Sequence, residues 1–475
     1  MRRLIIISDL HIGGDEYPML GHPEKLVNFL NELADYRPPP KQTIELVING
    51  DFVDFLAQAP FKAWTEDQSS AISKLEAAMT RFPSVFAALA RCAQKLSGLT
   101  LVLGNHDVEM ALPKVRERFL KELQTDTRRC TFIITNEAYS IGDLLIEHGN
   151  RYDGWNAIDH DGLRHTVSWA SRGEPPLAKE NMKICPGSQF VIEVMNPLKA
   201  RYYFIDLLKP ETKIVTLLIR AFEPALKYDL KVIYEAAQTY VGQWARTRPW
   251  LQTPFPQPGQ VEYVKRMEEM SASFPDDLRE RFAEELRPVY PNLQQTGLLS
   301  DFASALKKRF LRPLRPDSLR TRLERGEKIP AGQLRDIQVA LKHVLYNDRS
   351  FEFDEVDGPY VSAAKRMTQA GVAKVVVMGH THLAKNIDLG PGLKYVNTGT
   401  WADVIRVPME YLENTGEGLA GLEKWLESLV LNKIDSLRDS QPTYADVLVD
   451  ENGNVANSDN QPLLRSYEGK GLSEL

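Results

Sequence analysis

The most constraining feature of this chain of 475 residues is a short apolar run that stops abruptly at polar residues. The run, Leu99–Leu103, lies between two glycines and predicts a buried strand. Asn105, His106 and Asp107 follow it almost at once. Because α/β folds bind ligands where strands end at the rim of a sheet, we expect a functional site at this point.

Four other segments share this pattern, in which a predicted buried strand is followed by His, Asp or Gly. The five strand ends are Asp9-Leu10-His11, Gly50-Asp51 with Asp54 three residues on, Gly104-Asn105-His106-Asp107, His148-Gly149 and Gly379-His380-Thr381-His382. Five of the nine histidines lie in them. Imidazole, carboxylate and amide ligands without thiolate suit Mn, Fe or Zn and are unlike a structural zinc site.

Strands and helices are expected to alternate over the first 150 residues, which predicts an α/β layered fold. Strands are expected at 3–8, 43–48, 99–103, 131–135, 138–141 and 144–147, and helices at 24–36, 66–96 with a break near Pro83, and 113–123. Strands at 373–378 and 394–397, a helix at 419–437 and a hairpin region at 444–467 with an Asn452-Gly453 turn are expected near the C-terminus.

Between these two parts, strand-like alternation is rare, and Pro, Arg, Tyr and Trp become frequent. Helical spacing recurs at 277–286, 298–310 and 332–346. We therefore expect a catalytic domain built from 1–150 and 356–475, interrupted by a mostly helical cap domain at 151–355.

Charge and cysteine content restrict the partners and the setting of the protein. Residues 151–350 hold 31 Lys and Arg against 25 Asp and Glu, although the whole chain has a net charge of −6. The middle segment either meets an anionic partner or carries ordinary solvated helix faces.

Three widely spaced cysteines predict a reducing, cytoplasmic setting. No stretch approaches the roughly 18 apolar residues of a membrane span, so only peripheral membrane contact is left open.

In combination, the ordered motifs resemble those of the calcineurin-like metallophosphoesterases. The resemblance covers residues 1–150 and 356–475. It implies a two-sheet β-sandwich flanked by helices, here with the large inserted cap, and two divalent metal ions at the strand ends. Mn²⁺ is the favoured ion, with Fe or Zn as alternatives.

The resemblance also assigns roles to individual residues. One metal ion would be held by Asp9, His11, Asp51 and His382, and the second by Asp51, Asn105, His148 and His380. An anionic carboxylate shared between two cations relieves their mutual repulsion, and a hydroxide bridging the two ions would attack the phosphorus.

Two residues beside the ligands would assist this reaction. His106 would stabilise the transition state or protonate the leaving oxygen, and Asp107 would fix its tautomer and orientation. Asp54 fits better as support for the turn around Asp51 than as a ligand, although it could simply be a helix-start carboxylate. Arg151 is the candidate phosphate contact, or else an exposed loop arginine.

The motifs restrict the substrate only in part. Protein Ser/Thr phosphatases carry Arg-Gly where Phe55-Leu56 follows Asp54 here, which counts against that activity. Nucleases of the superfamily place their capping region after the last histidine motif, whereas this insertion precedes it. The insertion is similar in position to the lid of the UDP-2,3-diacylglucosamine pyrophosphatases. It is much larger, and His106 stands where those enzymes usually have Arg.

We therefore predict dimetal-dependent hydrolysis of a phosphomonoester, phosphodiester or pyrophosphate in a small or lipid-linked substrate. The basic residues and tryptophans of the cap suit a phosphorylated substrate with an apolar portion. One alternative is a metal-dependent nuclease that binds nucleic acid through nine Lys and Arg residues between 307 and 328. Another is a scaffold whose metal site has decayed. The natural substrate and the oligomeric state stay open.

Overall fold

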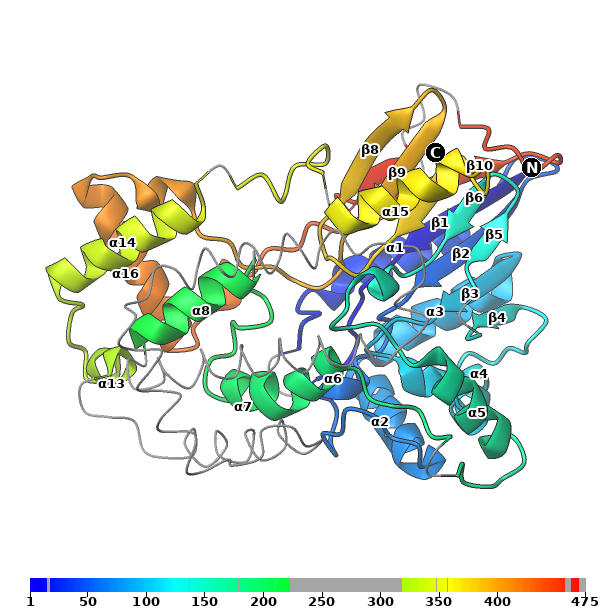
Figure 1. Ribbon diagram of the computed structural model, residues 1–475, viewed down its shortest axis with the longest axis horizontal. Helices are drawn as coiled ribbons and strands as arrows, with labels where there is room; N and C mark the ends of the chain where they lie inside the picture. Colours follow the sequence, from blue (N-terminus) through cyan, green and yellow to red (C-terminus); the bar gives the residue numbers. More distant parts are fainter. Residues whose placement is uncertain are drawn as a thin grey trace.

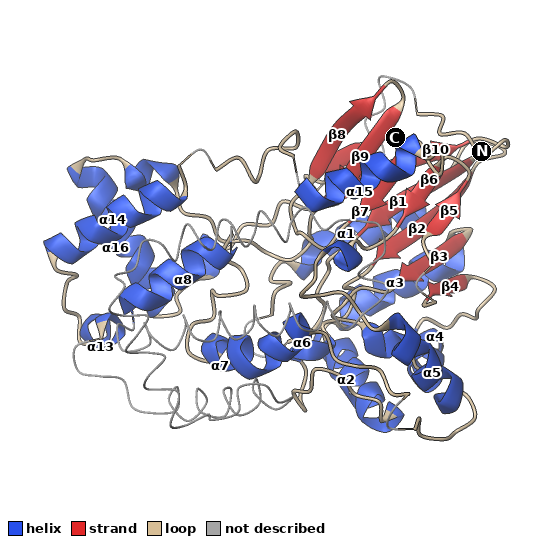
Figure 2. Cartoon of the chain, viewed as in Figure 1, coloured by secondary structure: helices blue, strands red, loops and turns tan. Residues whose placement is uncertain are grey.

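Two β-sheets packed face to face form one part of the molecule, with helices on their outer sides (Figures 1 and 2). The computed structural model describes residues 1–14, 18–135, 137–177, 180–209, 211–222, 318–346, 348–356, 358–457 and 463–469. Alternate residues of the first strand face opposite ways: Leu4 and Ile6 lie between the sheets, whereas Ile5 and Ile7 face the helices.

The first sheet has the strand order β11-β10-β1-β2-β3-β4. Its strands are β1 (Arg2–Ile7), β2 (Thr43–Asn49), β3 (Gly98–Val102), β4 (Cys130–Ile133), β10 (Thr443–Val449) and β11 (Leu464–Ser466). Strands β1 to β4 are parallel, and β10 is antiparallel to both β1 and β11. The four parallel strands therefore all end at the same edge of the sheet.

The second sheet has the order β5-β6-β7-β9-β8. Its strands are β5 (Tyr139–Ile141), β6 (Leu144–Ile146), β7 (Val375–Met378), β8 (Lys385–Gly390) and β9 (Leu393–Asn397). Here β6, β7 and β9 are parallel, while β5 and β8 are antiparallel edge strands. The expected two-sheet α/β architecture is confirmed.

Helices cover the outer faces of both sheets. They are α1 (Pro23–Asp35), α2 (Gln68–Arg81), α3 (Pro83–Lys95), α4 (Pro113–Glu122), α5 (His160–Ala170) and α15 (Gly358–Gln369). Apolar residues of α1 to α5 share one core with the outer face of the first sheet, and α15 packs on the second sheet. Short helical turns occur at η1 (Phe55–Ala57), η2 (Val108–Ala111), η3 (Asn150–Tyr152), η4 (Val191–Met195), η6 (Met409–Leu412) and η7 (Asp435–Leu437).

A second group of helices lies to one side of the sandwich (Figure 1). It contains α7 (Asn196–Lys199), α8 (Glu211–Phe222), α13 (Leu319–Glu324), α14 (Ala331–Val344) and α16 (Gly416–Val430), and α6 (Pro186–Phe190) leads into it. These helices share a separate apolar core to which α16 contributes Leu422, Trp425 and Leu426. We call this group the helical lobe.

The packing favours different domain limits from those expected from sequence. Helix α5 lies within the expected insertion, yet Leu163 packs in the core of the first sheet. Helix α16 lies within the expected catalytic segment, yet it packs in the helical lobe. The expected helix at 332–346 corresponds to α14, whereas those at 277–286 and 298–310 lie outside the described residues.

No helix in the described ranges is both long enough and apolar enough to cross a membrane. All three cysteines belong to these ranges and are buried free thiols.

Candidate metal centre

The five polar motifs all follow parallel strands that end at neighbouring edges of the two sheets. Residues after β1, β2 and β3 come from the first sheet, and residues after β6 and β7 come from the second. Backbone hydrogen bonds join these strand ends: Asp9 N–H donates to the Gly50 carbonyl at 3.1 Å, and Gly379 N–H to the His148 carbonyl at 2.9 Å. Parallel topology thus brings distant segments of the chain to one place.

One cluster of candidate ligands contains Asp9, His11 and His382, whose ligand atoms all lie within 4.8 Å of one another. The Nε2 atoms of the two histidines are 2.9 Å apart, and Oδ1 of Asp9 is 3.5 Å from Nε2 of His382. Asp9 and His11 are almost completely buried. This geometry fits a cation held between the two imidazoles and the carboxylate.

A second cluster contains Asp51, His148 and His380, again within 4.8 Å. Oδ2 of Asp51 lies 3.3 Å from Nε2 of His148 and 3.7 Å from Nε2 of His11 in the first cluster. The same oxygen therefore faces both clusters, which is the arrangement that a shared carboxylate requires.

The protonation of His148 follows from its surroundings. Its Nδ1 lies 2.8 Å from the Asn49 carbonyl, which can only accept a hydrogen bond, so Nδ1 carries the proton. Nε2 is then the nitrogen available to a cation; in the chain alone it faces Oδ2 of Asp51, and the carboxylates of Asp51 and Asp9 outweigh burial and raise the pKa of His148 to about 9. Oδ1 of Asn105 is buried without a hydrogen-bond partner among the described residues. Burial of such an atom is costly unless a ligand satisfies it, so a divalent cation fits this donor set.

Backbone strain is concentrated at the candidate ligands. Residues other than glycine rarely adopt positive φ values, and strained conformations cluster at functional sites because the surrounding structure must stabilise them. Five of the candidate ligands have such values: Asp9 (53°), His11 (44°), Asp51 (50°), His380 (73°) and His382 (61°).

Two glycines leave the space that the carboxylates occupy. A Cβ atom at Gly104 would lie 2.1 Å from Oδ1 of Asp51, and one at Gly379 would lie 2.6 Å from Oδ2 of Asp9. Any side chain at these positions would displace a candidate ligand. The glycines of the motifs are therefore explained by close approach as well as by turn geometry.

The structure places Asp54 against His106, where the sequence analysis expected Asp107. Oδ1 of Asp54 lies 3.1 Å from Nδ1 of His106. The Asp107 carboxylate instead accepts hydrogen bonds from the backbone N–H groups of Phe52 and Gly104, at 2.8 and 2.7 Å. An Asp directly before an apolar helical turn is typical of a helix cap, and Asp54 also has that role: it accepts from two backbone N–H groups of η1.

The charged groups of the chain, without any metal ion, favour the protonated form of His106. Burial would lower its pKa, but the carboxylates of Asp54 and Asp51 outweigh this effect and raise the pKa to about 10. Burial opposes ionisation of Asp54 as well, yet His106 and His11 hold its pKa well below the ordinary value. Backbone N–H of His106 also donates to Oδ1 of Asp51 at 2.9 Å, which links the two motifs.

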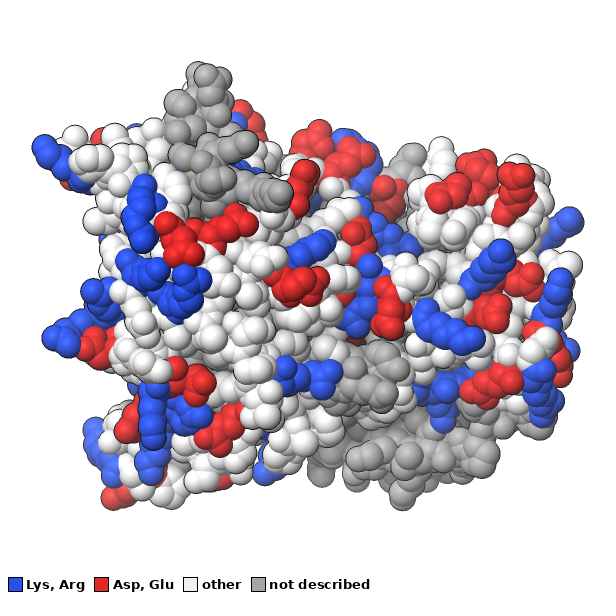
Figure 3. All heavy atoms as spheres, turned by 180° about the vertical axis from the view of Figure 1, so that it is seen from behind, with Lys and Arg blue, Asp and Glu red and all other residues white. Residues whose placement is uncertain are grey.

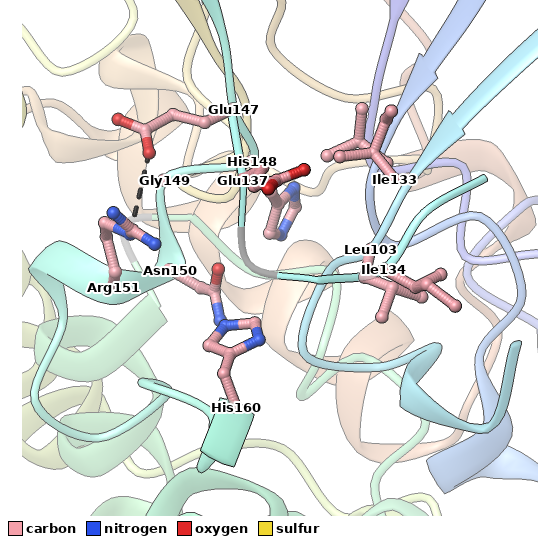
Figure 4. Close-up of a pocket in the computed structure, with 11 residues that line it drawn as sticks. Leu103, Ile133, Ile134, Glu137, Glu147, His148, Gly149, Asn150, Arg151 and His160 are labelled. Atoms are coloured by element: carbon pink, nitrogen blue, oxygen red, sulfur yellow. Dashed lines mark ion pairs between the residues drawn. The ribbon is translucent and has the colours of Figure 1, made fainter. Parts of the chain in front are cut away.

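Arg151 lines a small pocket beside His148 (Figure 4). The pocket has room for about 30 Å³ of solvent. Nε of Arg151 lies 3.6 Å from Oε2 of Glu147, so the guanidinium forms an ion pair along the wall. His160 lines the same pocket; burial and the charge of Arg151 lower its pKa to about 3. One wall is apolar and consists of Val102, Leu103, Ile133 and Ile134.

Two further residues lie near the clusters: Asp153, which follows the His148-Gly149 motif by four residues, and Lys209, whose local sequence gives no signal. Oδ2 of Asp153 lies 3.2 Å from Nε2 of His380. Lys209, from the edge of the helical lobe, is close enough for its charge, after burial, to lower the pKa of His382 well below the ordinary value. Its backbone N–H donates to the Ile405 carbonyl at 3.0 Å, which anchors this segment. Only long-range packing brings Lys209 to the site.

A two-sheet sandwich with clustered His and Asp side chains at its strand ends has the donor groups that could hold divalent metal ions. Consistent with this arrangement, a family model of the calcineurin-like phosphoesterases matches residues 2–189. The matched stretch contains β1 to β6 and four of the five motifs. Residues 2–189 thus carry the match to the calcineurin-like phosphoesterases, and the two-sheet fold agrees with it. Among curated proteins, no sequence matches it.

Proposed function

We propose that the protein uses two divalent metal ions to hydrolyse a phosphoester of a small or lipid-linked molecule. In this proposal one ion is held by Asp9, His11, Asp51 and His382, and the other by Asp51, Asn105, His148 and His380. The observation that carries it is the position of Oδ2 of Asp51 between Nε2 of His148 and Nε2 of His11. Mn²⁺ is the ion we favour for this mixed N and O donor set.

When bound, divalent ions supply Lewis-acid activation of the phosphoryl group and of water. The chain itself supplies proton transfer. His106 is 18% exposed, held by Asp54 and next to the candidate ligand Asn105, so its ring can donate a proton to a leaving oxygen or a hydrogen bond to the transition state. Asp54 holds the ring through Nδ1, which leaves Nε2 as the donor that faces substrate. Asp107 supports the backbone of the same loop.

The substrate proposal rests on what surrounds the clusters. Arg151 on the pocket wall and Lys209 at the lobe edge are the two cations we assign to phosphate contact. We infer that the helical lobe acts as the cap over the substrate, with its first boundary near residue 190.

A nuclease is the weaker candidate. The basic run at 307–328 falls partly outside the described residues, and its described arginines are paired with acids. Arg320 contacts Glu324 at 2.8 Å, and Arg322 contacts Glu327 at 3.5 Å. On the face drawn in Figure 3, basic and acidic side chains are interspersed over the described residues. A nucleic-acid groove requires a concentration of positive charge along one surface, and the described residues present no such surface on this face.

Hydrolysis of an aryl phosphate monoester and an aryl phosphodiester, each with added Mn²⁺, tests the proposal. The wild-type protein should hydrolyse at least one of them, and Asp51→Asn should lose most of the activity because it removes the shared negative charge. Activity that is unchanged in Asp51→Asn would overturn the proposed site. Salt-dependent retention on single- and double-stranded DNA tests the nuclease alternative separately.

A further inference from the structure

The segment that follows β6 folds back onto the candidate metal centre through two polar side chains. Oδ2 of Asp153 lies 3.2 Å from Nε2 of His380 and 2.7 Å from Nδ2 of Asn156. Its Oδ1 accepts from the backbone N–H of Trp155 at 2.9 Å. Both oxygens of Asp153 are thus occupied by donors from the chain, which leaves this carboxylate poorly placed to serve as a ligand itself.

The contact with Asp153 decides which nitrogen of His380 can bind a cation. An ionised carboxylate only accepts hydrogen bonds, so Nε2 of His380 carries the proton. The lone pair is then on Nδ1, and this atom is buried without a hydrogen-bond partner among the described residues. A histidine held by a carboxylate on one nitrogen is oriented and made more basic for a cation on the other.

Asn156 makes the corresponding contact with a second candidate ligand. Its Oδ1 lies 3.5 Å from Nδ2 of Asn105, a long contact that engages the amide nitrogen of that side chain. Oδ1 of Asn105, the atom that a metal ion would use, is buried and has no hydrogen-bond partner in the described part of the chain. The amide of Asn105 is therefore turned so that its oxygen is the free end.

The position of Asn156 is itself tightly defined. Its backbone carbonyl accepts from Nδ2 of Asn150 at 2.9 Å, and its backbone N–H donates to the carbonyl of Asp153 at 3.0 Å. A Cβ atom at Gly187 would lie only 2.0 Å from Oδ1 of Asn156. Gly187 is also fixed, because its N–H donates to the Trp155 carbonyl at 2.7 Å. The start of α6 thus confines Asn156 from one side.

We propose that Asp153 and Asn156 are positioning residues that together orient His380 and Asn105, two ligands of the same ion. This inference rests on the proposed function, because it assigns both ligands to the second metal ion. One rigid turn of seven residues, 150–156, would then set half of the ligands of that ion while leaving the first ion untouched. Removal of such outer partners typically weakens metal affinity 10- to 100-fold.

Titration of the purified protein with Mn²⁺ alone, followed by calorimetry and by the electron paramagnetic resonance signal of free Mn²⁺, tests this inference without an activity assay. The wild type should bind two ions. Asp153→Asn should weaken one of them 10- to 100-fold, and Asn156→Ala should weaken the same one. Asp161→Asn is the matched control, since Asp161 is exposed on the next helix and pairs only with Arg164 among the contacts described for it.

Two single-ion backgrounds identify which ion is affected. In His382→Ala, which retains the second set of ligands, Asp153→Asn should still weaken binding 10- to 100-fold. In His148→Ala, which retains the first set, Asp153→Asn should leave the remaining affinity unchanged. Equal weakening in both backgrounds would overturn the inference, because the effect would then be a general loss of structure.

Other outcomes separate this inference from the proposed function. If Asp153→Asn and Asn156→Ala both bind two ions as tightly as the wild type, the positioning role is wrong and the metal centre stands. If the wild type binds no pair of divalent ions, the proposed function fails. If Asp153→Asn loses its near-ultraviolet circular dichroism, the variant is misfolded, and Asn156→Ala and Asp153→Glu replace it in the test. Asp153→Glu should then recover part of the Mn²⁺ affinity.

Discussion

Oδ1 of Asp54 lies 3.1 Å from Nδ1 of His106, and Oδ2 of the same carboxylate lies 3.4 Å from Nδ1 of His11. One buried carboxylate therefore orients both the candidate proton donor and a candidate metal ligand. Backbone N–H groups of Leu56 and Ala57 also donate to Oδ1 at 3.1 Å, so the carboxylate cannot rotate freely. Through its two carboxylate oxygens, Asp54 therefore contacts histidines from two different motifs.

Asp54→Asn should lower kcat about 10- to 100-fold, because the amide cannot accept from both imidazoles and its N–H₂ group faces one of them. Steady-state hydrolysis of an aryl phosphate, with circular dichroism as the check on folding, measures this effect. Asp107→Asn is the comparison, and it should act mainly on thermal stability, because Asp107 accepts from the backbone. A larger loss of kcat in Asp107→Asn than in Asp54→Asn would contradict this assignment.

Gly104→Ala should disrupt the shared carboxylate, since the new Cβ would lie 2.1 Å from Oδ1 and 2.4 Å from the backbone nitrogen of Asp51. We expect at least a tenfold loss of Mn²⁺ affinity, measured by calorimetry. Gly98→Ala is the matched control at the start of the same strand, where a Cβ would meet no atom closer than 3.6 Å. Wild-type metal affinity in Gly104→Ala would show that Asp51 can move without consequence.

Removal of metal should destabilise the folded protein. The buried Oδ1 of Asn105, which has no hydrogen-bond partner among the described residues, gains one when a cation binds, and a ligand present at about 100 times its Kd stabilises by about 2.7 kcal/mol. Differential scanning calorimetry of chelator-treated protein, with and without added Mn²⁺, should show a higher Tm with the metal. In Asp51→Asn the same addition should produce a much smaller increase, and an equal increase would place the ion elsewhere.

Lys209→Met should raise KM about tenfold with a smaller change in kcat, if this cation binds the phosphate of the substrate before and during the reaction. Lys209→Arg should retain most of the affinity because it keeps the positive charge. Steady-state kinetics on the substrate hydrolysed by the wild type give both constants. A fall in kcat at constant KM would instead assign Lys209 to the transition state.

Stability should fall in mild acid because His160 is held neutral in the folded state. Its pKa is lowered to about 3 from 6.5, so below pH 6.5 the unfolded chain binds a proton that the folded chain does not. The free energy of unfolding should therefore decrease by about 1 to 2 kcal/mol between pH 6.5 and about pH 5. Urea unfolding measures this free energy at each pH. In His160→Asn most of the decrease should be absent, whereas the control His343→Gln, on the exposed face of α14, should show the same decrease as the wild type.

Much of the sandwich could be predicted from local patterns. The expected strand at 43–48 is β2, and the expected helical stretch at 66–96 is α2 and α3, separated at Phe82 just before Pro83. Proline lacks the backbone N–H that would continue α2, so the break is a local property. Strand β8 was not expected, because its polar sequence Lys-Asn-Ile-Asp-Leu-Gly has few residues typical of strands.

The partners of the amphipathic helices could not be predicted in the same way. The pattern of α16 indicates that one face is buried, but it does not indicate against what. Leu422, Trp425 and Leu426 pack in the helical lobe, although the sequence analysis assigned this segment to the catalytic domain. Distance along the sequence does not predict which helices pack together here, because the helical lobe combines residues from three distant parts of the chain.

Residue types at short spacing predict most of the strands, the donor chemistry of the motifs and the resemblance to the calcineurin-like phosphoesterases, because each of these is a local property of the chain. Only the tertiary structure shows that Asp54 orients His106 and that Asp153 contacts His380. Each of these contacts joins segments that are distant in the chain and depends on the angle at which strands and loops pack. No periodicity along the chain encodes that angle.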